Sequence, residues 1–412
     1  MSARRHILLM WLAWSLIVVG FMYAAPLRVH PQRPDHALPW TAAETGADSL
    51  SNKPYLQDPA LNPLVAWDSE FYLGIATGGY DEVGKIAPVT ADGESHPKTY
   101  AYLPLYPYLM KLLRVPFVWL GGSDIGASAA AGVLVSLLGT LGGLFALYEL
   151  ARADLGEVGA LRCAWMMLIF PASFHFAVVY SEGVFVGLAF GALALLRRKH
   201  WLGAALLAAL ATWTRSVGIL LLLPLLTTWL IAFLRTPGGG TRFGLLSHPR
   251  RQLIPVLPLL FAPIVAYLAW RAAYGAEFDF VQTQWFDNRL LDLPATWQAW
   301  ETALQEARTW PEARYTLYLS LSAVVLALGS VILEARRHPQ LALFGGLALL
   351  IPLTSGVASV NSALRYVLVM PTLWILLGRM TAHPVVDRTW SLLSILLLGI
   401  QAFLFSTDLW SS

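Results

Sequence analysis

One apolar run sets the fold of this chain: residues 161–196, LRCAWMMLIFPASFHFAVVYSEGVFVGLAFGALALL. As a single helix the run would be roughly 54 Å long, whereas the hydrocarbon core of a bilayer is about 30 Å thick. Pro171 lies near the middle of the run, and proline interrupts a helix because it has no backbone N–H to donate. We therefore expect two short membrane passes joined by a tight turn.

The whole chain of 412 residues has the same character. It is 57% hydrophobic and only 13% charged, whereas soluble domains carry about 25% charged residues. The lone Cys163 excludes an internal disulfide and suits inert packing. The sequence predicts an all-α polytopic membrane protein with about 11 transmembrane helices, near 7–25, 125–149, 160–172, 181–196, 201–214, 216–234, 253–273, 315–334, 340–355, 364–378 and 390–409.

Charge supports this topology. With the N-terminus in the cytoplasm, and 7–25 as an uncleaved signal anchor, the cytoplasmic segments hold 15 of the 28 basic residues but only 5 of the 25 acids. The positive-inside rule requires this excess. The bases are Arg4, Arg5, Arg152, Arg162, Arg197, Arg198, Lys199, Arg235, Arg242, Arg250, Arg251, Arg336, Arg337, Arg379 and Arg388, and the acids are Glu149, Asp154, Glu157, Glu334 and Asp387.

We expect residues 1–412 to form a single integral membrane domain with two sizeable extracytoplasmic segments, 26–123 and 274–314. The first begins with a Pro-rich, irregular stretch that extends to Pro63. A short helix is expected over 68–78. Residues 100–120 are aromatic and apolar, which favours helices that lie in the membrane interface.

Asp68 is the first candidate for chemistry. It lies in WDSEFYLGIATGGY (67–80), and a carboxylate beside aromatic rings at a membrane surface suits the deprotonation of a hydroxyl. A plain helix N-cap explains the same residue, because Asp ahead of a helix accepts from free backbone donors. Glu70 would complete a D-x-E cation site on extended backbone, but on a helix side chains two apart point away from each other.

Two arginines are candidates for binding an anion. Arg215 separates two apolar runs, and Arg365 stands at the start of the pass 364–378, so the topology places both on the outer face. The planar guanidinium suits two-point recognition of phosphate. We expect the pair to hold one phosphate group; the alternative is an arginine that merely reaches the interface.

Three further positions could assist. Glu182 begins a pass directly below the outer turn, where a carboxylate costs free energy unless it is paired or hydrated. It would orient a sugar hydroxyl or pair with one of the arginines. His175 in the same turn could do similar work, although a lone histidine is more often structural. Gln284 and Trp285 in the second outer segment could hydrogen-bond and stack on a sugar.

The sequence also argues against several functions. It contains no nucleotide-binding glycine pattern, no metal-spaced His/Cys cluster and no Ser-His-Asp arrangement. Its basic residues are scattered among predicted cytoplasmic turns, which argues against nucleic-acid binding. We expect no cofactor and no metal, with Asp68 and Glu70 as the one alternative cation site.

The chain resembles the PIG-V family in stretches that follow the family's order: WDSEFYLGIATGGY, YLPLYPYLMKLL, FPASFHFAVVYSEGVF, ATWTRSVGILLLLP and, later, SALRYVLVMP. These are multipass glycosyltransferases of the GT-C type, typified by the second mannosyltransferase of GPI-anchor assembly. The similarity extends over most of residues 60–375, and residues 30–63 and the C-terminal pass are the least family-like.

The resemblance implies an inverting transfer of a hexose, with mannose favoured, from a polyprenyl (dolichyl-type) phosphate sugar to an acceptor hydroxyl on the extracytoplasmic face. Asp68 falls on the family's carboxylate base, and Arg215 and Arg365 fall on its outer-facing arginines, which would bind the donor phosphate. Substrate-binding residues are expected among Trp67, Glu70, Tyr72, His175, Tyr180, Glu182, Gln284 and Trp285.

The chain has no Asn-x-Ser/Thr sequon, which favours a bacterial plasma membrane over the endoplasmic reticulum. Bacteria build no GPI anchors, so a lipid-linked, glycan or protein acceptor all remain open. Two rival functions use the same residues differently. A flippase for a lipid-linked sugar would need the arginines but no base, and it should show repeats that the sequence lacks. A non-catalytic scaffold would tolerate the loss of all three residues.

Overall fold

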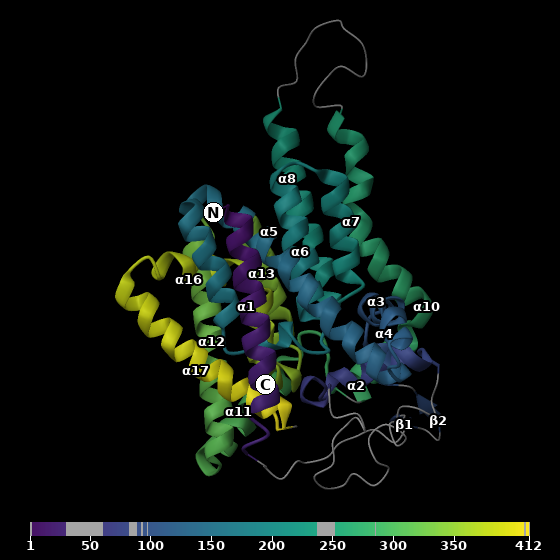
Figure 1. The fold of residues 1–412 in the computed structure, drawn as a ribbon. Coiled ribbons are helices and arrows are strands. Elements are labelled where there is room, and N and C mark those ends of the chain that lie inside the picture. The colour runs from purple at the N-terminus through teal and green to yellow at the C-terminus, as the bar shows by residue number, and fades with distance from the viewer. Residues whose placement is uncertain are drawn as a thin grey trace, which may run out of the picture.

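The computed structural model describes residues 2–29, 61–81, 89–91, 94–96, 98–236, 252–284, 286–407 and 409–411. Over these ranges the chain is a bundle of helices, as predicted (Figure 1). The exception is a small antiparallel ribbon of β1 (Val89–Ala91) and β2 (Glu94–His96), in which Thr90 pairs with Ser95. Part of the first outer segment that was predicted as irregular, residues 30–60, lies outside the described residues.

The helices follow one another in the predicted order. The elements are α1 (Ala3–Ala24), η2 (Asn62–Leu64), α2 (Asp68–Gly78), η3 (Lys98–Ala101), α3 (Leu105–Leu113), α4 (Val115–Trp119), α5 (Asp124–Ile169), η4 (Ser173–Phe176), α6 (Glu182–Arg197), α7 (Trp201–Thr212), η5 (Ser216–Leu221), α8 (Leu222–Arg235), η6 (Ile254–Phe261), α10 (Ala262–Gln284), α11 (Leu293–Thr309), α12 (Pro311–Glu334), α13 (Pro339–Leu353), α14 (Ala358–Asn361), α15 (Ala363–Tyr366), η7 (Val367–Val369), α16 (Pro371–Met380) and α17 (Pro384–Ser406).

Six helical segments of the described chain are long and apolar enough to cross a membrane. A seventh is added if Ala363–Val369 and Pro371–Met380, which meet at 84°, form one bent span. Each of the eleven predicted passes coincides with helix, but α7 and α13 are shorter apolar helices. The protein is therefore an integral membrane protein of helical type, and the count of eleven is not confirmed.

The predicted break in the run 161–196 is present. α5 ends at Ile169, and Pro171 and η4 follow before α6 begins at Glu182. The predicted loop between 149 and 160 is instead helical, interrupted only at Gly156, whose φ of 67° suits glycine because it has no Cβ.

α5 nevertheless reverses direction at Gly156. Its first arm runs parallel to α6, because Gly139 lies against Gly187 and Leu150 accepts a hydrogen bond from Arg197. Its second arm runs antiparallel to α16: Cys163 lies against Gly378, and Phe170 packs edge-on against Trp374 with ring centroids 5.2 Å apart. The long helix thus supplies two adjacent arms, at the positions where the sequence predicts two passes.

The crossing of α5 and α6 is close because three glycines leave the backbones bare. A Cβ on Gly183 would overlap the carbonyl oxygen of Ser136, and one on Gly187 would overlap the carbonyl of Gly139. Only residues without a side chain allow this approach. The contact fixes the start of α6, and with it Glu182.

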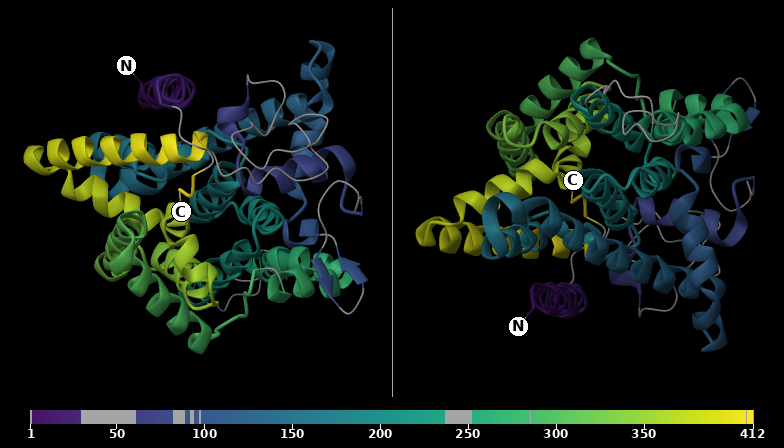
Figure 2. Two further views of the ribbon diagram at one scale, coloured as in Figure 1. Left: turned by 90° about the horizontal axis from the view of Figure 1, so that it is seen from below. Right: turned by 90° about the horizontal axis from the view of Figure 1, so that it is seen from above.

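The bundle has two distinct ends (Figure 1). The C-terminus, α2 and α11 lie at one end, which we call the pocket end, and the N-terminus lies at the other, the opposite end. Figure 2 shows α1 on the outside of the bundle, where it packs against α5 and α17. The second outer segment, 274–314, is mostly helical, because α10 continues to Gln284 and α11 fills much of the remainder.

Candidate functional site

A pocket of about 390 Å³ opens at the pocket end. Segments far apart in sequence meet there: α2, the turn after η3, Tyr180, the break before η5, the chain after α10, α15 and the C-terminal residues. It is lined by Trp67, Asp68, Tyr72, Ala101, Tyr102, Leu103, Tyr180, Thr214, Arg215, Ser216, Gln282, Phe286, Asp287, Asn288, Val357, Ser362, Arg365, Tyr366, Trp410 and Ser411. Six of these were predicted from the sequence as site residues.

Asp68 is the first residue of α2, and the interpretation of it as an N-cap is wrong. The N-cap position is Trp67, and no side chain caps the helix there. The Asp68 carboxylate instead accepts from the hydroxyl of Tyr102 at 3.0 Å and pairs with Nη1 of Arg365 at 2.7 Å. It remains 25% exposed, so it faces the pocket and can reach a ligand there.

The backbone of Trp67, directly before Asp68, has an unusual conformation. Its φ is 56°, a left-handed value that a bulky residue rarely adopts. The ring packs edge-on against Trp410, with centroids 5.0 Å apart. Holding such a conformation costs roughly 1–3 kcal/mol and requires support from the surroundings. The contact with Trp410 provides it and brings the C-terminal residues to the pocket wall.

The two predicted arginines come together over one carboxylate. Glu182 is 1% exposed, and its Oε1 forms ion pairs with Nη1 of Arg215 and, at 3.3 Å, with Nε of Arg365. The expected pairing of Glu182 with an arginine is therefore present. With Asp68, the four side chains form one network with a formal charge of zero. A buried charge is tolerated when it is paired in this way.

Aromatic rings enclose the network. Tyr102 packs edge-on against Tyr72 and stacks on Phe71, with centroids 5.1 and 4.8 Å apart. The guanidinium of Arg365 lies over the ring of Tyr180, at 5.4 Å from its centroid. Burial, reinforced by the charge of Asp68, holds the pKa of Tyr102 well above its usual range. Tyr102 therefore remains a hydrogen-bond donor to Asp68 at physiological pH.

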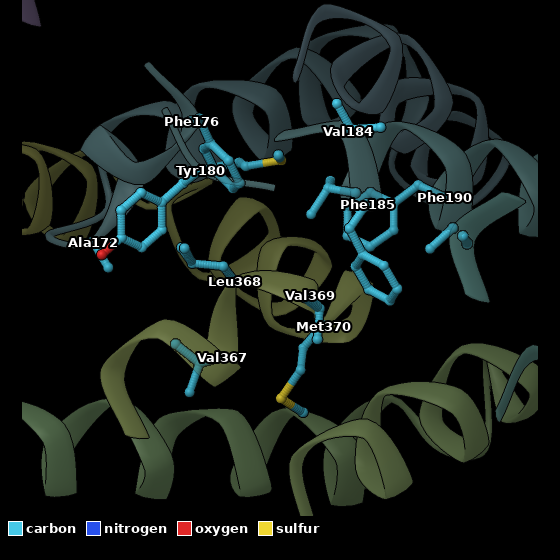
Figure 3. Packing of buried hydrophobic residues seen from close by; sticks show 14 of the residues in the cluster. Ala172, Phe176, Tyr180, Val184, Phe185, Phe190, Val367, Leu368, Val369 and Met370 are labelled. Carbon is cyan, nitrogen blue, oxygen red and sulfur yellow. The ribbon is translucent and has the colours of Figure 1, made fainter. Parts of the chain in front are cut away.

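A packed apolar core supports the site from behind. Figure 3 shows the segment from Ala172 to Phe190 facing the segment Val367–Met370 across this core. The first segment contains Tyr180 and Glu182, and the second comes shortly after Arg365 in the chain. The position of the network is therefore fixed by contacts between α6, η4 and η7 rather than by a flexible loop.

His175 supports the site without lining it. It is 1% exposed, its Nδ1 donates to the carbonyl of Ala172 at 3.0 Å, and its ring packs on Tyr180. Burial lowers the pKa of His175 to about 4, so the ring is neutral at neutral pH. His175 therefore has the structural role that the sequence analysis gave as the alternative to substrate binding.

Other predicted residues lie away from the pocket. Glu70 is buried in the first turn of α2, and only Asp68 of the D-x-E pair lines the pocket. Gln284 is exposed at the end of α10 and does not line the pocket, and Trp285 lies outside the described residues. Their neighbours Gln282, Phe286 and Asn288 line it instead.

Sequence reasoning missed several lining residues. Tyr102 belongs to the aromatic stretch that the sequence predicts to be interfacial, and Trp410 follows the last pass. Repeated tyrosines in TYAYLPLYPYL were the available signal for the first, but a tyrosine in such a stretch is also typical of a membrane interface. No sequence signal brings residue 410 next to residue 67.

Comparison with known proteins identifies the family. Residues 18–233, or 216 of the 412, match the sequence profile described as mannosyltransferase (PIG-V). The chain belongs to this family. The resemblance found in the sequence is thereby confirmed, and the protein is a membrane glycosyltransferase. No curated protein sequence matches the chain.

Solved structures show more distant similarity. ArnT from Cupriavidus metallidurans, bound to undecaprenyl phosphate, has a TM-score of 0.46 at 13% identity, over 84% of this chain and 73% of that one. The Archaeoglobus fulgidus oligosaccharyltransferase with zinc and sulfate has a TM-score of 0.44 at 14% identity, over 82% and 49%. AglB from the same organism, with an inhibitory peptide and a dolichol-phosphate, has a TM-score of 0.44 at 12% identity, over 98% and 56%. The chain spans about half the length of this archaeal enzyme.

Proposed function

We propose that this PIG-V family protein is a GT-C type enzyme that transfers a hexose, with mannose as the favoured sugar, from a polyprenyl-phosphate sugar to an acceptor hydroxyl. One observation carries the proposal: the carboxylate of Asp68, at the wall of an aromatic-lined pocket, lies 2.7 Å from the guanidinium of Arg365. A proton acceptor and a phosphate-binding group thus stand side by side, which is what transfer from a sugar phosphate needs.

Asp68 is the proposed general base. It takes the proton of the acceptor hydroxyl as that oxygen bonds to the anomeric carbon. The bond from the same carbon to the phosphate oxygen breaks on the opposite face, and the lipid phosphate leaves with the electron pair. A single displacement of this kind inverts the anomeric centre. General-base help of this type contributes typically about 10²–10⁴-fold to the rate.

Arg215 and Arg365 are the proposed ligands of the donor phosphate. Their charges are balanced by Glu182 and Asp68 in the structure described here. Glu182 is buried and holds both guanidinium groups in place, whereas Asp68 is the more exposed partner. We infer that the phosphate draws Arg365 away from Asp68. A carboxylate that loses a neighbouring cation accepts a proton more readily, so donor binding prepares the base.

The site requires no metal in this proposal, because a lipid phosphate is a good leaving group and two arginines balance its charge. Only one carboxylate of the Asp68–Glu70 pair lines the pocket. Four basic residues that the sequence predicts as cytoplasmic lie at the opposite end: Arg197, Lys199, Arg337 and Arg379. We propose that this end is cytoplasmic and the pocket extracytoplasmic, in a bacterial plasma membrane.

The test is transfer of radiolabelled mannose from a short polyprenyl-phosphate mannose, in membranes containing the wild type or Asp68→Asn, with EDTA present. Asp287→Asn is the matched control, because Asp287 is a second carboxylate that lines the same pocket. We expect transfer by the wild type and the control and a loss of about 10²–10⁴-fold in Asp68→Asn. Equal activity in Asp68→Asn would remove this residue as the base, and undiminished donor movement without transfer would indicate a flippase.

A further inference from the structure

A second cavity lies at the opposite end of the bundle. It has a volume of about 260 Å³ and is formed where the first arm of α5 and the C-terminal part of α6 meet the middle of α8 and the beginning of α13. It is lined by Leu150, Leu193, Leu196, Arg197, Lys199, Thr228, Arg337, His338, Gln340 and Leu341. It shares no residue with the pocket around Asp68, and the proposed reaction does not use it.

The cavity has a basic rim. Arg197, Lys199 and Arg337 line it, and no carboxylate of the described residues does. The nearest acids are engaged elsewhere. Glu149 pairs with Arg152 and Arg198, while Asp154 and Glu334 pair with Arg379 and lie near the imidazole of His338. Three positive charges therefore face the cavity without a matching negative charge in its wall.

Lys199 occupies a backbone position that normally belongs to glycine. It follows the end of α6 with φ of 59°. Its N–H donates to the carbonyl of Leu196, and the N–H of His200 donates to that of Leu195, which together form a Schellman motif. A side chain in this left-handed conformation costs roughly 1–2 kcal/mol. The chain thus carries a lysine at the cavity rim where glycine would fit the backbone better.

Thr228 also lines the cavity and adds a hydroxyl group to the three cations. Its hydroxyl is buried and has no hydrogen-bond partner among the described residues, although Thr227 beside it donates to the carbonyl of Leu223. A buried hydroxyl without a partner costs about 1–3 kcal/mol. An acceptor oxygen placed in the cavity would satisfy it.

We propose that this cavity binds the headgroup of an anionic phospholipid. The phosphate is held by Arg197, Lys199 and Arg337, and a headgroup or ester oxygen accepts from Thr228. The start of an acyl chain lies against Leu150, Leu193, Leu196 and Leu341, whose apolar side chains would gain nothing from a free phosphate ion. The three cations lie at helix ends, the depth at which lipid phosphates meet a bundle of membrane-spanning helices.

The test uses the full-length protein in detergent and native mass spectrometry. Its three probes are short-chain phosphatidylglycerol, phosphatidylcholine with the same chains, and inorganic phosphate. We expect saturable binding of phosphatidylglycerol at least tenfold tighter than that of the other two. Equal binding of phosphatidylcholine would overturn the role of charge, and equal binding of inorganic phosphate would overturn the role of the chain.

Two variants separate the site from the fold. Lys199→Gly relieves the left-handed backbone, so its unfolding temperature should equal or exceed that of the wild type, while its affinity for phosphatidylglycerol falls roughly fivefold, the effect of one charge near a membrane surface. The triple variant R197Q/K199Q/R337Q should lose far more of its affinity for phosphatidylglycerol. A matched control, R235Q/R336Q/R388Q, removes three exposed charges that do not line the cavity. Unchanged affinity in Lys199→Gly, or an equal loss in the control, would overturn the proposal.

Discussion

The two ends of the bundle carry ion networks of similar composition and different surroundings. At the pocket end, Asp68 and Glu182 pair with Arg215 and Arg365. At the opposite end, Asp154 and Glu334 pair with Arg379, beside His338. In both networks one glutamate is fully buried and one aspartate is about a quarter exposed: 25% for Asp68 and 27% for Asp154.

The difference lies in what each aspartate faces. Asp68 opens onto a pocket with tyrosine and tryptophan walls, whereas Asp154 lines none of the cavities described above. Atoms of Asp154, Glu334 and His338 lie within 4.8 Å of one another, a spacing that a metal ion could use. The guanidinium of Arg379 already provides positive charge there. Similar ion pairs can therefore build a site in one place and join helices in another.

The largest expected difference between the two networks is at the aspartates. Asp68→Asn should lower the transfer rate by about 10²–10⁴-fold. Asp154→Asn should leave the rate of the folded protein within twofold and lower stability by about 1–3 kcal/mol, because a charged hydrogen-bond acceptor is lost. Rates per folded molecule and thermal unfolding of both variants provide the measurement. A large loss of rate in Asp154→Asn would contradict the assignment of a purely structural role to the second network.

Substitution of an arginine should produce a smaller difference between the two networks than substitution of an aspartate. Arg365→Lys keeps the charge but loses the planar group, so donor affinity should fall about 10- to 100-fold, the value of one charged hydrogen bond. Arg379→Lys is the counterpart at the opposite end and should leave donor affinity unchanged. Titration with a short polyprenyl-phosphate sugar tests both. Unaltered binding in Arg365→Lys would count against its role at the phosphate.

His175 makes the pocket end sensitive to acid. The folded protein keeps this ring neutral down to a pKa of about 4, whereas the unfolded chain protonates near 6.5. Lowering the pH from 7 to 5 therefore favours the unfolded state, by about 2 kcal/mol from this residue. In His175→Phe the unfolding temperature should fall less over that range. His200→Gln, at an exposed position, serves as the control and should behave like the wild type.

Each aspartate has a second, uncharged or weakly basic partner besides its arginine, and the effects of removing these partners should also differ. Tyr102 donates to Asp68 at 3.0 Å, and His338 lies 3.2 Å from Asp154. Tyr102→Phe removes one hydrogen bond and should reduce the transfer rate by about fivefold to tenfold. His338→Gln should leave that rate unchanged. Kinetic measurement of both variants would show whether orientation of Asp68 by Tyr102 contributes to the reaction.

Much of the fold followed from local patterns in the sequence. The run 161–196 exceeds the thickness of a bilayer and contains a proline, so its division into two passes was predictable. The helical turn at 150–159 was not, because Gly156 reverses α5 within a nearly continuous helix. The total number of passes also depends on helix length, and α7 and α13 end after 12 and 15 residues.

The site was predictable where residues stand at the ends of apolar runs. Glu182, Arg215 and Arg365 were singled out in this way and Asp68 by its aromatic neighbours, and the structure brings the four together. Their pairing was only partly predictable, since no acid stands next to either arginine in sequence. Gln282, Phe286 and Trp410 were missed because their place in the pocket depends on the path of the chain after α10 and after α17.

The close crossing of α5 and α6 has a consequence for how substrate preference can change. Gly139, Gly183 and Gly187 leave no room for a new side chain, so positions near Glu182 tolerate little variation. Other parts of the pocket wall are connecting chain, where Phe286, Asn288 and Ser411 line the pocket. Directed evolution of acceptor range should therefore find its productive substitutions at these three positions, while the glycines remain fixed.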